Sequence, residues 1–219
     1  EMVQLTNVVL LAGITGAGKD TIKKRLLKMP YFRDIVSHTT RLPRINNGKS
    51  EEDGVDYHFI DQSTAVKMLQ NREFVEAKFV HGTIYGTSVA EIKLAYDQNK
   101  VAITDIDVQG AAEYEKLSPC GIAIFIVPPT YQTWIEKLKK RYKTEADFQA
   151  EWPNRRKTSV KELEHALEVP YYHIIINDDL DNSVQTCCEI IKRGDLFNSR
   201  DDHARLAARS LLDELEKIH

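Results

Sequence analysis

The stretch Val8–Thr21 reads VVLLAGITGAGKDT and decides the fold class. Its apolar first part is typical of a buried strand, and the glycines that follow allow a tight turn into a helix. In such a turn backbone N–H groups converge on phosphate oxygens, the helix start adds partial positive charge, and Lys19 adds a full charge. The sequence therefore predicts a phosphate-binding loop whose contacts come from Gly13, Gly16, Ala17, Gly18, Lys19, Asp20 and Thr21.

One position of this loop departs from the usual pattern. A Ser or Thr that holds Mg²⁺ normally follows the lysine, and here that position is Asp20. A carboxylate beside a triphosphate repels it unless Mg²⁺ lies between them. Asp20 could therefore be a metal ligand, it could point away while Thr21 contacts the phosphate, or it could weaken nucleotide binding.

Composition limits the class of protein. The 219 residues carry a formal net charge of −3, with 42% hydrophobic and 29% charged residues, as in an ordinary globular domain. We expect no nucleic-acid partner, because no basic stripe interleaved with aromatics is present. We also expect no membrane partner, because no apolar run has the length of a span. The cysteines lack metal-ligand spacing and favour a reduced, cytoplasmic setting; they are Cys120, Cys187 and Cys188.

Short apolar runs alternate with helical patterns along the chain. This alternation predicts an α/β fold, in which helices flank a parallel sheet. The expected core strands are Val8–Ala12, Ile35–His38, Val101–Asp105, Ile122–Val127 and His173–Ile176. The expected helices are Gly18–Lys28, Val89–Gln98, Tyr131–Arg141, Val160–Glu168 and Asn182–Lys192.

Two segments interrupt the alternation, and a third follows it. Between Arg41 and Tyr85 a polar, glycine-containing loop precedes two strand patterns with a helix between them, which predicts a small β-rich insertion. The segment Tyr142–Asn154 is polar, contains a Trp-Pro pair and is interpreted as a mobile lid. The tail should form a helix that packs on its own core or on another copy, giving a monomer or a homodimer; its apolar positions are Leu206, Leu211, Leu212, Leu215 and Ile218.

A second group of residues is suited to a small anionic ligand. Ser37–Arg44 reads SHTTRLPR, and its two arginines, separated by a stiff Pro43, can hold a phosphate from two sides; a solvated basic turn is the alternative. Downstream, Glu76 could accept paired hydrogen bonds from an N1–H and an exocyclic amine, an edge that guanine offers and adenine does not. Glu76 could equally be an exposed strand residue.

Six motifs behind the phosphate loop resemble, in order, those of the guanylate kinase family. They are Ser37–Arg44, Glu51-x-x-Gly54-x-Asp56-Tyr57, Phe74-Val75-Glu76-Ala77, Gly82-x-x-Tyr85-Gly86-Thr87, Asp105-Ile106-Asp107-Val108-Gln109-Gly110 and Ile176-Asn177-Asp178-Asp179. The resemblance implies Mg²⁺-dependent transfer of the γ-phosphoryl group of ATP to GMP, giving ADP and GDP. It also implies a core P-loop domain (1–36, 93–141 and 157–194), a GMP-binding subdomain (37–92), a helical lid (142–156) and a C-terminal helical extension (195–219).

The resemblance also implies roles for individual residues. The GMP phosphate would be held by Ser37, Arg41, Arg44, Glu51, Tyr57 and Tyr85, and the guanine by Glu76, Thr87 and Asp107. Mg²⁺ would be held by Asp105, with Asp20 as a second candidate. ATP would contact the phosphate loop and Asn177, with Asp178 as a second candidate near the adenine. A turn-forming Asn-Asp pair is the alternative reading.

Catalytic positive charge is implied for four residues: Lys19, Arg41, Arg141 and Arg155. Arg156 is the alternative to Arg155, and a family arginine corresponds to Lys137 here, which keeps the charge but loses the bidentate fork. Two other functions remain open at this point. One is a guanylate-kinase-like binding module without catalysis, and the other is a kinase for a different nucleoside monophosphate.

Overall fold

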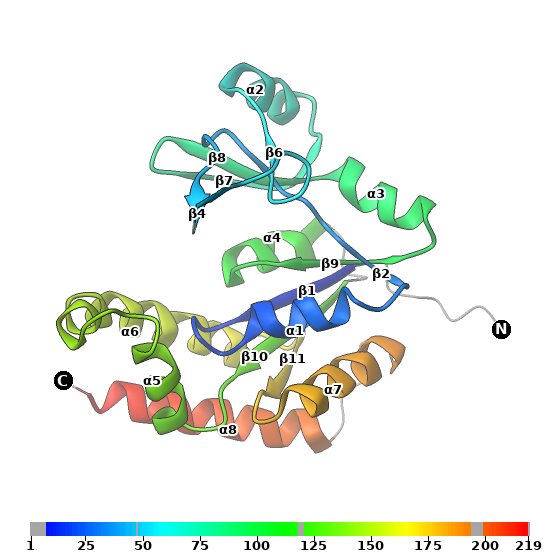
Figure 1. Cartoon of the computed structure of the whole chain (residues 1–219). Coiled ribbons are helices and arrows are strands. Elements are labelled where there is room, and N and C mark those ends of the chain that lie inside the picture. The colour runs from blue at the N-terminus through cyan, green and yellow to red at the C-terminus, as the bar shows by residue number, and fades with distance from the viewer. Residues whose placement is uncertain (1–7, 47, 118–120, 194–198, 219) are drawn as a thin grey trace.

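A five-stranded parallel sheet forms the centre of the molecule (Figure 1). The computed structural model describes residues 8–46, 48–117, 121–193 and 199–218. The strand order is β11-β10-β1-β9-β2. The strands are β1 (Val8–Gly13), β2 (Phe32–Asp34), β9 (Val101–Asp105), β10 (Ile122–Val127) and β11 (Tyr172–Ile176). The predicted α/β fold with a parallel sheet is confirmed.

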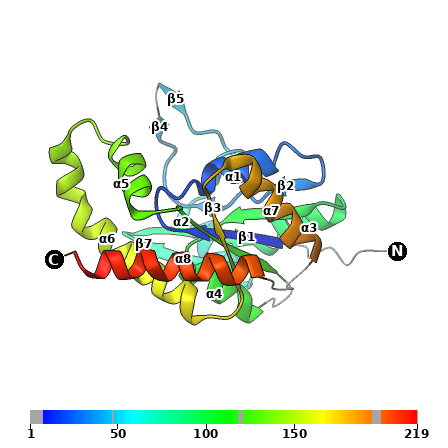
Figure 2. The same ribbon diagram turned by 90° about the horizontal axis from the view of Figure 1, so that it is seen from below.

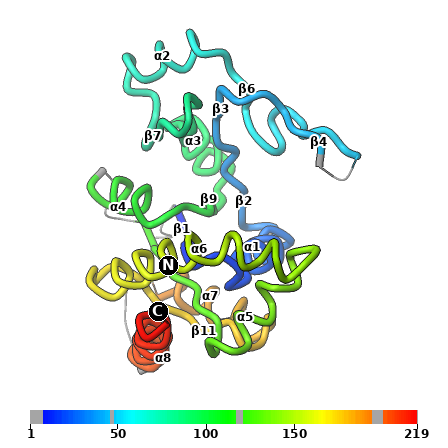
Figure 3. The backbone as a smooth tube through the Cα atoms, turned by 90° about the vertical axis from the view of Figure 1, so that its left-hand side faces the viewer, coloured from blue at the N-terminus to red at the C-terminus, as the bar shows by residue number. Residues whose placement is uncertain are grey.

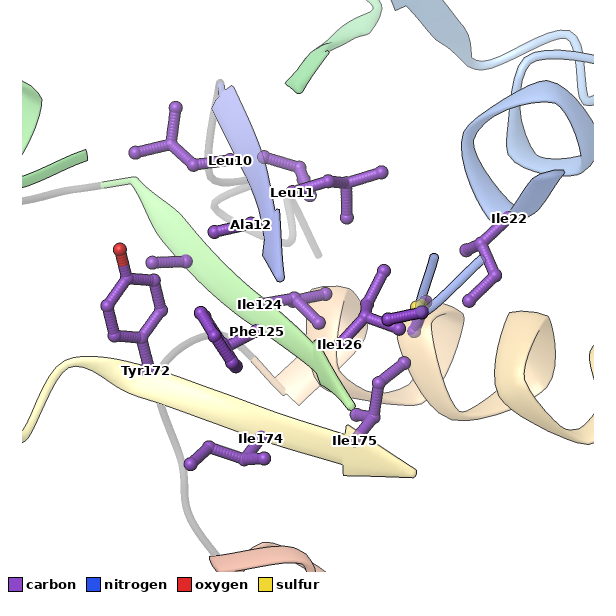
Figure 4. Packing of buried hydrophobic residues seen from close by; sticks show 14 of the residues in the cluster. Leu10, Leu11, Ala12, Ile22, Ile124, Phe125, Ile126, Tyr172, Ile174 and Ile175 are labelled. Atoms are coloured by element: carbon purple, nitrogen blue, oxygen red, sulfur yellow. The ribbon is translucent and has the colours of Figure 1, made fainter. Parts of the chain in front are cut away.

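Helices cover both faces of this sheet (Figure 2), which is why its central strands are apolar on both sides. On one face lie α1 (Lys19–Leu26) and α7 (Leu180–Arg193), and on the other α4 (Val108–Leu117), α6 (Glu145–Glu168) and α8 (Ser199–Glu216). Every residue of β1 and β10 is buried. Figure 4 shows Leu11, Ile126 and Ile175 filling the space between the sheet and the helices.

A second, smaller sheet stands apart from the core (Figure 3). Its order is β6-β3-β8-β7, and β3 pairs parallel to β6 but antiparallel to β8. The strands are β3 (His38–Thr39), β6 (His58–Phe59), β7 (Phe74–Val80) and β8 (Thr83–Ser88), accompanied by α2 (Gln62–Gln70) and by the hairpin of β4 (Ile45–Asn46) and β5 (Lys49–Ser50). The chain returns to the core through α3 (Val89–Asp97). This sheet confirms the predicted β-rich insertion.

The predicted strand Ile35–His38 was wrong. Its residues connect the two sheets, since β2 ends at Asp34 and β3 begins at His38. The backbone N–H of Ile35 still donates to Ile103 of the core sheet, but that of Val36 donates to the buried Glu91 carboxylate instead of to a strand. The apolar run is therefore the segment that connects the core sheet to the second sheet.

The lid prediction was partly wrong about helix boundaries. The predicted helix Val160–Glu168 is only the end of α6, whose 24 residues also include most of the predicted lid. A capping box at Thr144 starts this helix, and Trp152 stacks on Phe148 with ring centroids 5.4 Å apart. Helix α5 (Tyr131–Lys139) precedes it. The proposed boundary between lid and core at residue 156 consequently falls inside a continuous helix, and α4 was not predicted.

The tail packs on the core of its own chain. Leu211, Leu212 and Leu215 are buried in the main cluster, whereas Leu206 is 71% exposed, contrary to the prediction for that residue. The Arg205 guanidinium donates to the Tyr172 carbonyl at 2.9 Å and reaches the final carbonyls of α6 at 3.4–3.5 Å. Across the described residues, we find no helix with the length and apolarity required to cross a bilayer.

Candidate active site

The phosphate loop joins β1 to α1 and depends on two glycines. Gly13 has φ +149°, and a Cβ there would lie 2.4 Å from the Ile126 carbonyl oxygen. Gly18 has φ +95°, and its Cβ would lie 2.2 Å from the Asn177 side-chain nitrogen. A side chain at either position would displace a neighbour, so the loop backbone packs closely against β10 and Asn177.

Two distant side chains brace the loop, and sequence reasoning missed both contacts. The Trp134 indole donates to the Thr15 carbonyl at 2.8 Å, and the buried Asn177 amide donates to the Ala17 carbonyl at 2.7 Å. Ser183 in turn donates to Asn177 at 3.1 Å. Asn177 was predicted to lie near adenine; the structure places its amide on the loop itself.

A cavity of about 400 Å³ lies beside the loop. Its lining combines predicted ATP-site residues with Lys137, Arg141 and one residue that was not predicted to bind, Leu180; the remaining members are Gly16, Gly18, Thr21, Asn177 and Asp178. The mixture of backbone donors, cationic side chains and an apolar surface fits the base and phosphates of a nucleotide.

Asp105 lies at the end of β9, close to the loop. The Lys23 ammonium donates to it at 2.8 Å and pairs with Asp34 at 2.7 Å. Partial burial acts to raise the pKa of Asp105, but Lys23 and Lys19 outweigh it and hold that pKa below its usual value. An ionised carboxylate that is 45% exposed beside the phosphate loop fits a magnesium ion or its water ligands. Asp20 is exposed in the first turn of α1.

The second sheet carries a preorganised arginine. Arg41 forms a bidentate pair with Glu51, at 2.7 and 3.1 Å, and lies over the Tyr57 ring at 5.3 Å. Glu51 also accepts from the Arg44 backbone N–H at 2.7 Å. The bond from Arg41 and that N–H keep the pKa of Glu51 below its usual value. The Tyr85 ring lies 6.1 Å from that of Tyr57, so these predicted phosphate-site residues are neighbours.

The predicted guanine-site residues lie on β7, on β8 and just before α4. Glu76 pairs across the strands with the buried Thr87. Burial raises the pKa of Glu76, although Thr87 and Lys78 oppose the shift. Asp107 accepts from the Gly110 backbone N–H at 2.9 Å and from the Lys78 ammonium. Lys78 was missed, although its spacing of two from Glu76 in a predicted strand places both on one face.

The two candidate lid arginines have different surroundings. Arg155 pairs with Glu151 at 2.8 Å on the outer part of α6 and lies over the Tyr142 ring. Arg156 donates instead to the Leu215 carbonyl of α8 at 2.8 Å. Arg156 therefore connects α6 to α8. Among the described residues, Arg155 has no such contact with α8.

Glu162 lies where the two groups of residues adjoin. Burial raises the pKa of this α6 carboxyl to about 7, while Lys19 of the phosphate loop lowers it and Asp107 of the guanine group raises it. Lys19 and Asp107 are thus both close enough to Glu162 to act on its carboxyl group.

The central strand β1, its glycine loop and Lys19 define the chain as a P-loop nucleotide-binding protein, with a second sheet that carries an anion clamp. The family model described as guanylate kinase matches residues 5–194. The chain belongs to the guanylate kinase family. The resemblance inferred from the motifs is confirmed.

Individual relatives agree with this placement. The chain is 36% identical over 184 residues to "Guanylate kinase" of Thiobacillus denitrificans, covering 84% of each protein. It is also 36% identical over 199 residues to "Guanylate kinase 1" of Oryza sativa subsp. japonica. That alignment covers 89% of this chain but only 48%, about half, of the rice protein. Among solved structures, guanylate kinase from Anaplasma phagocytophilum superposes with a TM-score of 0.61 over 88% of both chains at 24% identity, which supports the fold.

Proposed function

We propose that the two groups of side chains bind the two substrates of a single phosphoryl transfer. The activity of the chain is that of a guanylate kinase, which transfers the γ-phosphoryl group of ATP to GMP and releases ADP and GDP. The observation that carries the assignment is the combination of an intact phosphate loop with Lys19 and a half-buried Glu76 beside Thr87. A binding module without catalysis would not require the loop, and a kinase for an adenine substrate would not require the carboxylate.

In the ATP half, the loop from Gly13 to Gly18 and Lys19 would bind the phosphates, and the adenine would enter the cavity beside Asn177 and Asp178. Mg²⁺ arriving with ATP would neutralise negative charge on the phosphates. Asp105 would hold the ion or its waters, with Asp20 or Thr21 at the start of α1 as the second contact.

In the GMP half, Arg41, Arg44, Ser37, Tyr57 and Tyr85 would bind the phosphate. The carboxylate of Glu51 cannot itself attract an anion. Its bidentate bond to Arg41 supports a positioning role, in which Glu51 aims the guanidinium and fixes the backbone at Arg44. Glu76, Thr87 and Asp107 would read the guanine.

Catalysis would consist of alignment and charge neutralisation, because phosphoryl transfer leaves little covalent work for the protein. Lys19, Arg41, Arg141 and Arg155 would surround the transferred group. Closure of the GMP-binding subdomain (37–92) and the lid (142–156) over the core would exclude water, which would otherwise hydrolyse ATP. We further propose a cytoplasmic enzyme that works as a monomer or homodimer.

The test is a coupled assay of the purified chain with ATP, Mg²⁺ and each of GMP, AMP and dTMP. We expect GDP formation to exceed turnover of the other nucleotides by orders of magnitude. Failure to form GDP, together with ATP binding in calorimetry, would make the chain a catalytically impaired relative. Preference for AMP or dTMP would contradict the assignment of Glu76.

A further inference from the structure

One face of the second sheet carries a group of four side chains. Glu76 and Lys78 are two residues apart on β7 and therefore lie on the same face. Their cross-strand partners on β8 are Thr87 and Tyr85, respectively. Three of these four residues belong to the proposed GMP site. The fourth, Lys78, has no role in it so far.

Lys78 spans the gap between this sheet and the core. Its ammonium forms an ion pair with Asp107, the proposed guanine reader before α4. It also lies near the first turn of α4, since a Cβ on Gly110 would be 3.3 Å from the Lys78 nitrogen. The Lys78 side chain is only 21% exposed. The ammonium is thus held beside both carboxylates of the guanine pocket.

One group of guanine, the O6 oxygen, can accept more hydrogen bonds than the predicted guanine-site residues can donate. The Watson–Crick edge of guanine presents two donors, the N2 amine and N1–H, followed by one acceptor, O6. The carboxylates of Glu76 and Asp107 can accept from the donors but cannot donate to O6. Thr87 lies beside Glu76 on the neighbouring strand and has a single hydroxyl proton to donate, whereas a carbonyl oxygen such as O6 has two lone pairs. A lysine has three donor protons and can serve Asp107 and O6 together.

We propose that Lys78 determines base specificity by donating a hydrogen bond to O6 of guanine from its position on Asp107. This inference rests on the proposed function. The same ammonium would repel the 6-amino group of adenine, which presents a donor at the position of O6. Lys78 therefore adds a selective element to the two carboxylates, and it links the moving subdomain to the core when the base is bound.

The experiment compares the wild-type chain with Lys78→Met, which keeps the length of the side chain and removes its charge and donors. Substrates are GMP, 6-thio-GMP, whose sulfur is a weak acceptor, and IMP, which keeps O6 but lacks the N2 amine. We expect kcat/KM for GMP to fall on the order of tenfold to a hundredfold, as for the loss of a hydrogen bond from a charged group. The fall for 6-thio-GMP should be several times smaller, while the ratio of GMP to IMP and the KM for ATP stay unchanged.

Ratios between substrates are measured on one enzyme sample and do not depend on the fraction that is folded. Lys78→Gln, which restores a neutral donor, should recover part of the lost GMP activity. Lys67→Met on α2, an exposed lysine of the same subdomain, is the matched control and should behave as wild type. Unchanged or improved GMP turnover in Lys78→Met, or equal losses for GMP and 6-thio-GMP, would overturn the proposal. Absence of GMP phosphorylation in the wild type would instead refute the proposed function.

Discussion

The ATP half and the GMP half of this site differ in the kind of chemical group that they offer to a ligand. Around the phosphate loop the groups proposed to bind the ligand are mainly backbone N–H donors, in a loop held by Asn177 and Trp134. On the second sheet they are side chains, such as Arg41 and Glu76, supported by short strands and ion pairs. The ATP half therefore depends on the main chain and the core, whereas the GMP half depends on individual side chains and can change specificity without loss of the fold.

The largest effect is expected from Lys19→Ala, which removes the full positive charge that the loop offers to the phosphates. Turnover should fall roughly 10³-fold, because charge on the transferred group is no longer neutralised in a site that excludes water. GMP binding in calorimetry should persist, since Arg41 and Glu51 lie in the segments that follow β3 and β5, outside the core sheet. Simultaneous loss of GMP binding would mean that the two halves are not independent.

The two lid arginines should separate catalysis from stability. Arg155→Met should lower kcat by about 10²-fold, the usual result of deleting a group that stabilises transition-state charge. Arg156→Met should lower the melting temperature by several degrees, corresponding to about 1 kcal/mol, because the Leu215 carbonyl loses its partner. Steady-state kinetics and thermal unfolding of both variants test this, and the reverse pattern would assign the catalytic role to Arg156.

Two glycine variants test the role of the main chain. Gly18→Ala and Gly82→Ala both place a side chain at positive φ, +95° and +83°, at a cost of about 1–2 kcal/mol in stability. Only the first also meets a neighbour, Asn177, while Gly82 faces open space. We expect the KM for ATP to rise about tenfold or more in Gly18→Ala and to stay constant in Gly82→Ala. Equal KM values for ATP in the two variants would contradict the proposal that the main chain of the loop binds ATP.

Glu51→Gln should affect the GMP half alone. An amide cannot form the charged bidentate pair, so Arg41 loses its orientation and the KM for GMP should rise about tenfold. The exposed neighbour Glu52 provides the control variant Glu52→Gln, which should leave both KM values unchanged. An equal rise in the KM for ATP would show that Glu51 acts beyond its own sheet.

The smallest effect is a pH dependence specific to GMP. Burial raises the pKa of Glu76, so on acidification this carboxylate is protonated at a higher pH than an ordinary glutamate. The protonated form can no longer accept from both N1–H and the N2 amine of guanine, so kcat/KM for GMP should fall by a few-fold while the KM for ATP is constant. Glu76→Gln should lose most GMP activity and this acidic limb. An acidic limb that persists in the variant would belong to another group.

The sequence predicted those structural features that depend on residues close together in the chain. The loop, its strand and its helix lie within a few turns of chain, and the alternation of apolar runs was sufficient for the parallel sheet. The bond from Trp134 to Thr15 joins residues 119 positions apart, and no local pattern contains it. Ile35 and Val36 are apolar enough for a strand, but hydrogen bonds to two different layers determined their conformation.

For the residues of the site, local motifs predicted which kind of side chain would be present better than they predicted what that side chain does. Arg41 and Glu51 were both expected at the phosphate, yet only the fold shows that one of them holds the other. The role of Lys78 could not be predicted, because its partner Asp107 belongs to another layer of the molecule. The continuity of α6 from Glu145 to Glu168 was also missed, since Pro153 within it is a signal that usually ends a helix.

The position of β1 has a consequence for biosynthesis. This strand is synthesised before its hydrogen-bonded neighbours β9 and β10, which leave the ribosome only after the whole second sheet has been synthesised. Until then a wholly apolar strand has no partner in its sheet, and contacts of such long sequence separation form slowly. We therefore expect the small sheet to acquire structure before the phosphate loop does, and expression yield to depend on how well the nascent β1 is protected from aggregation.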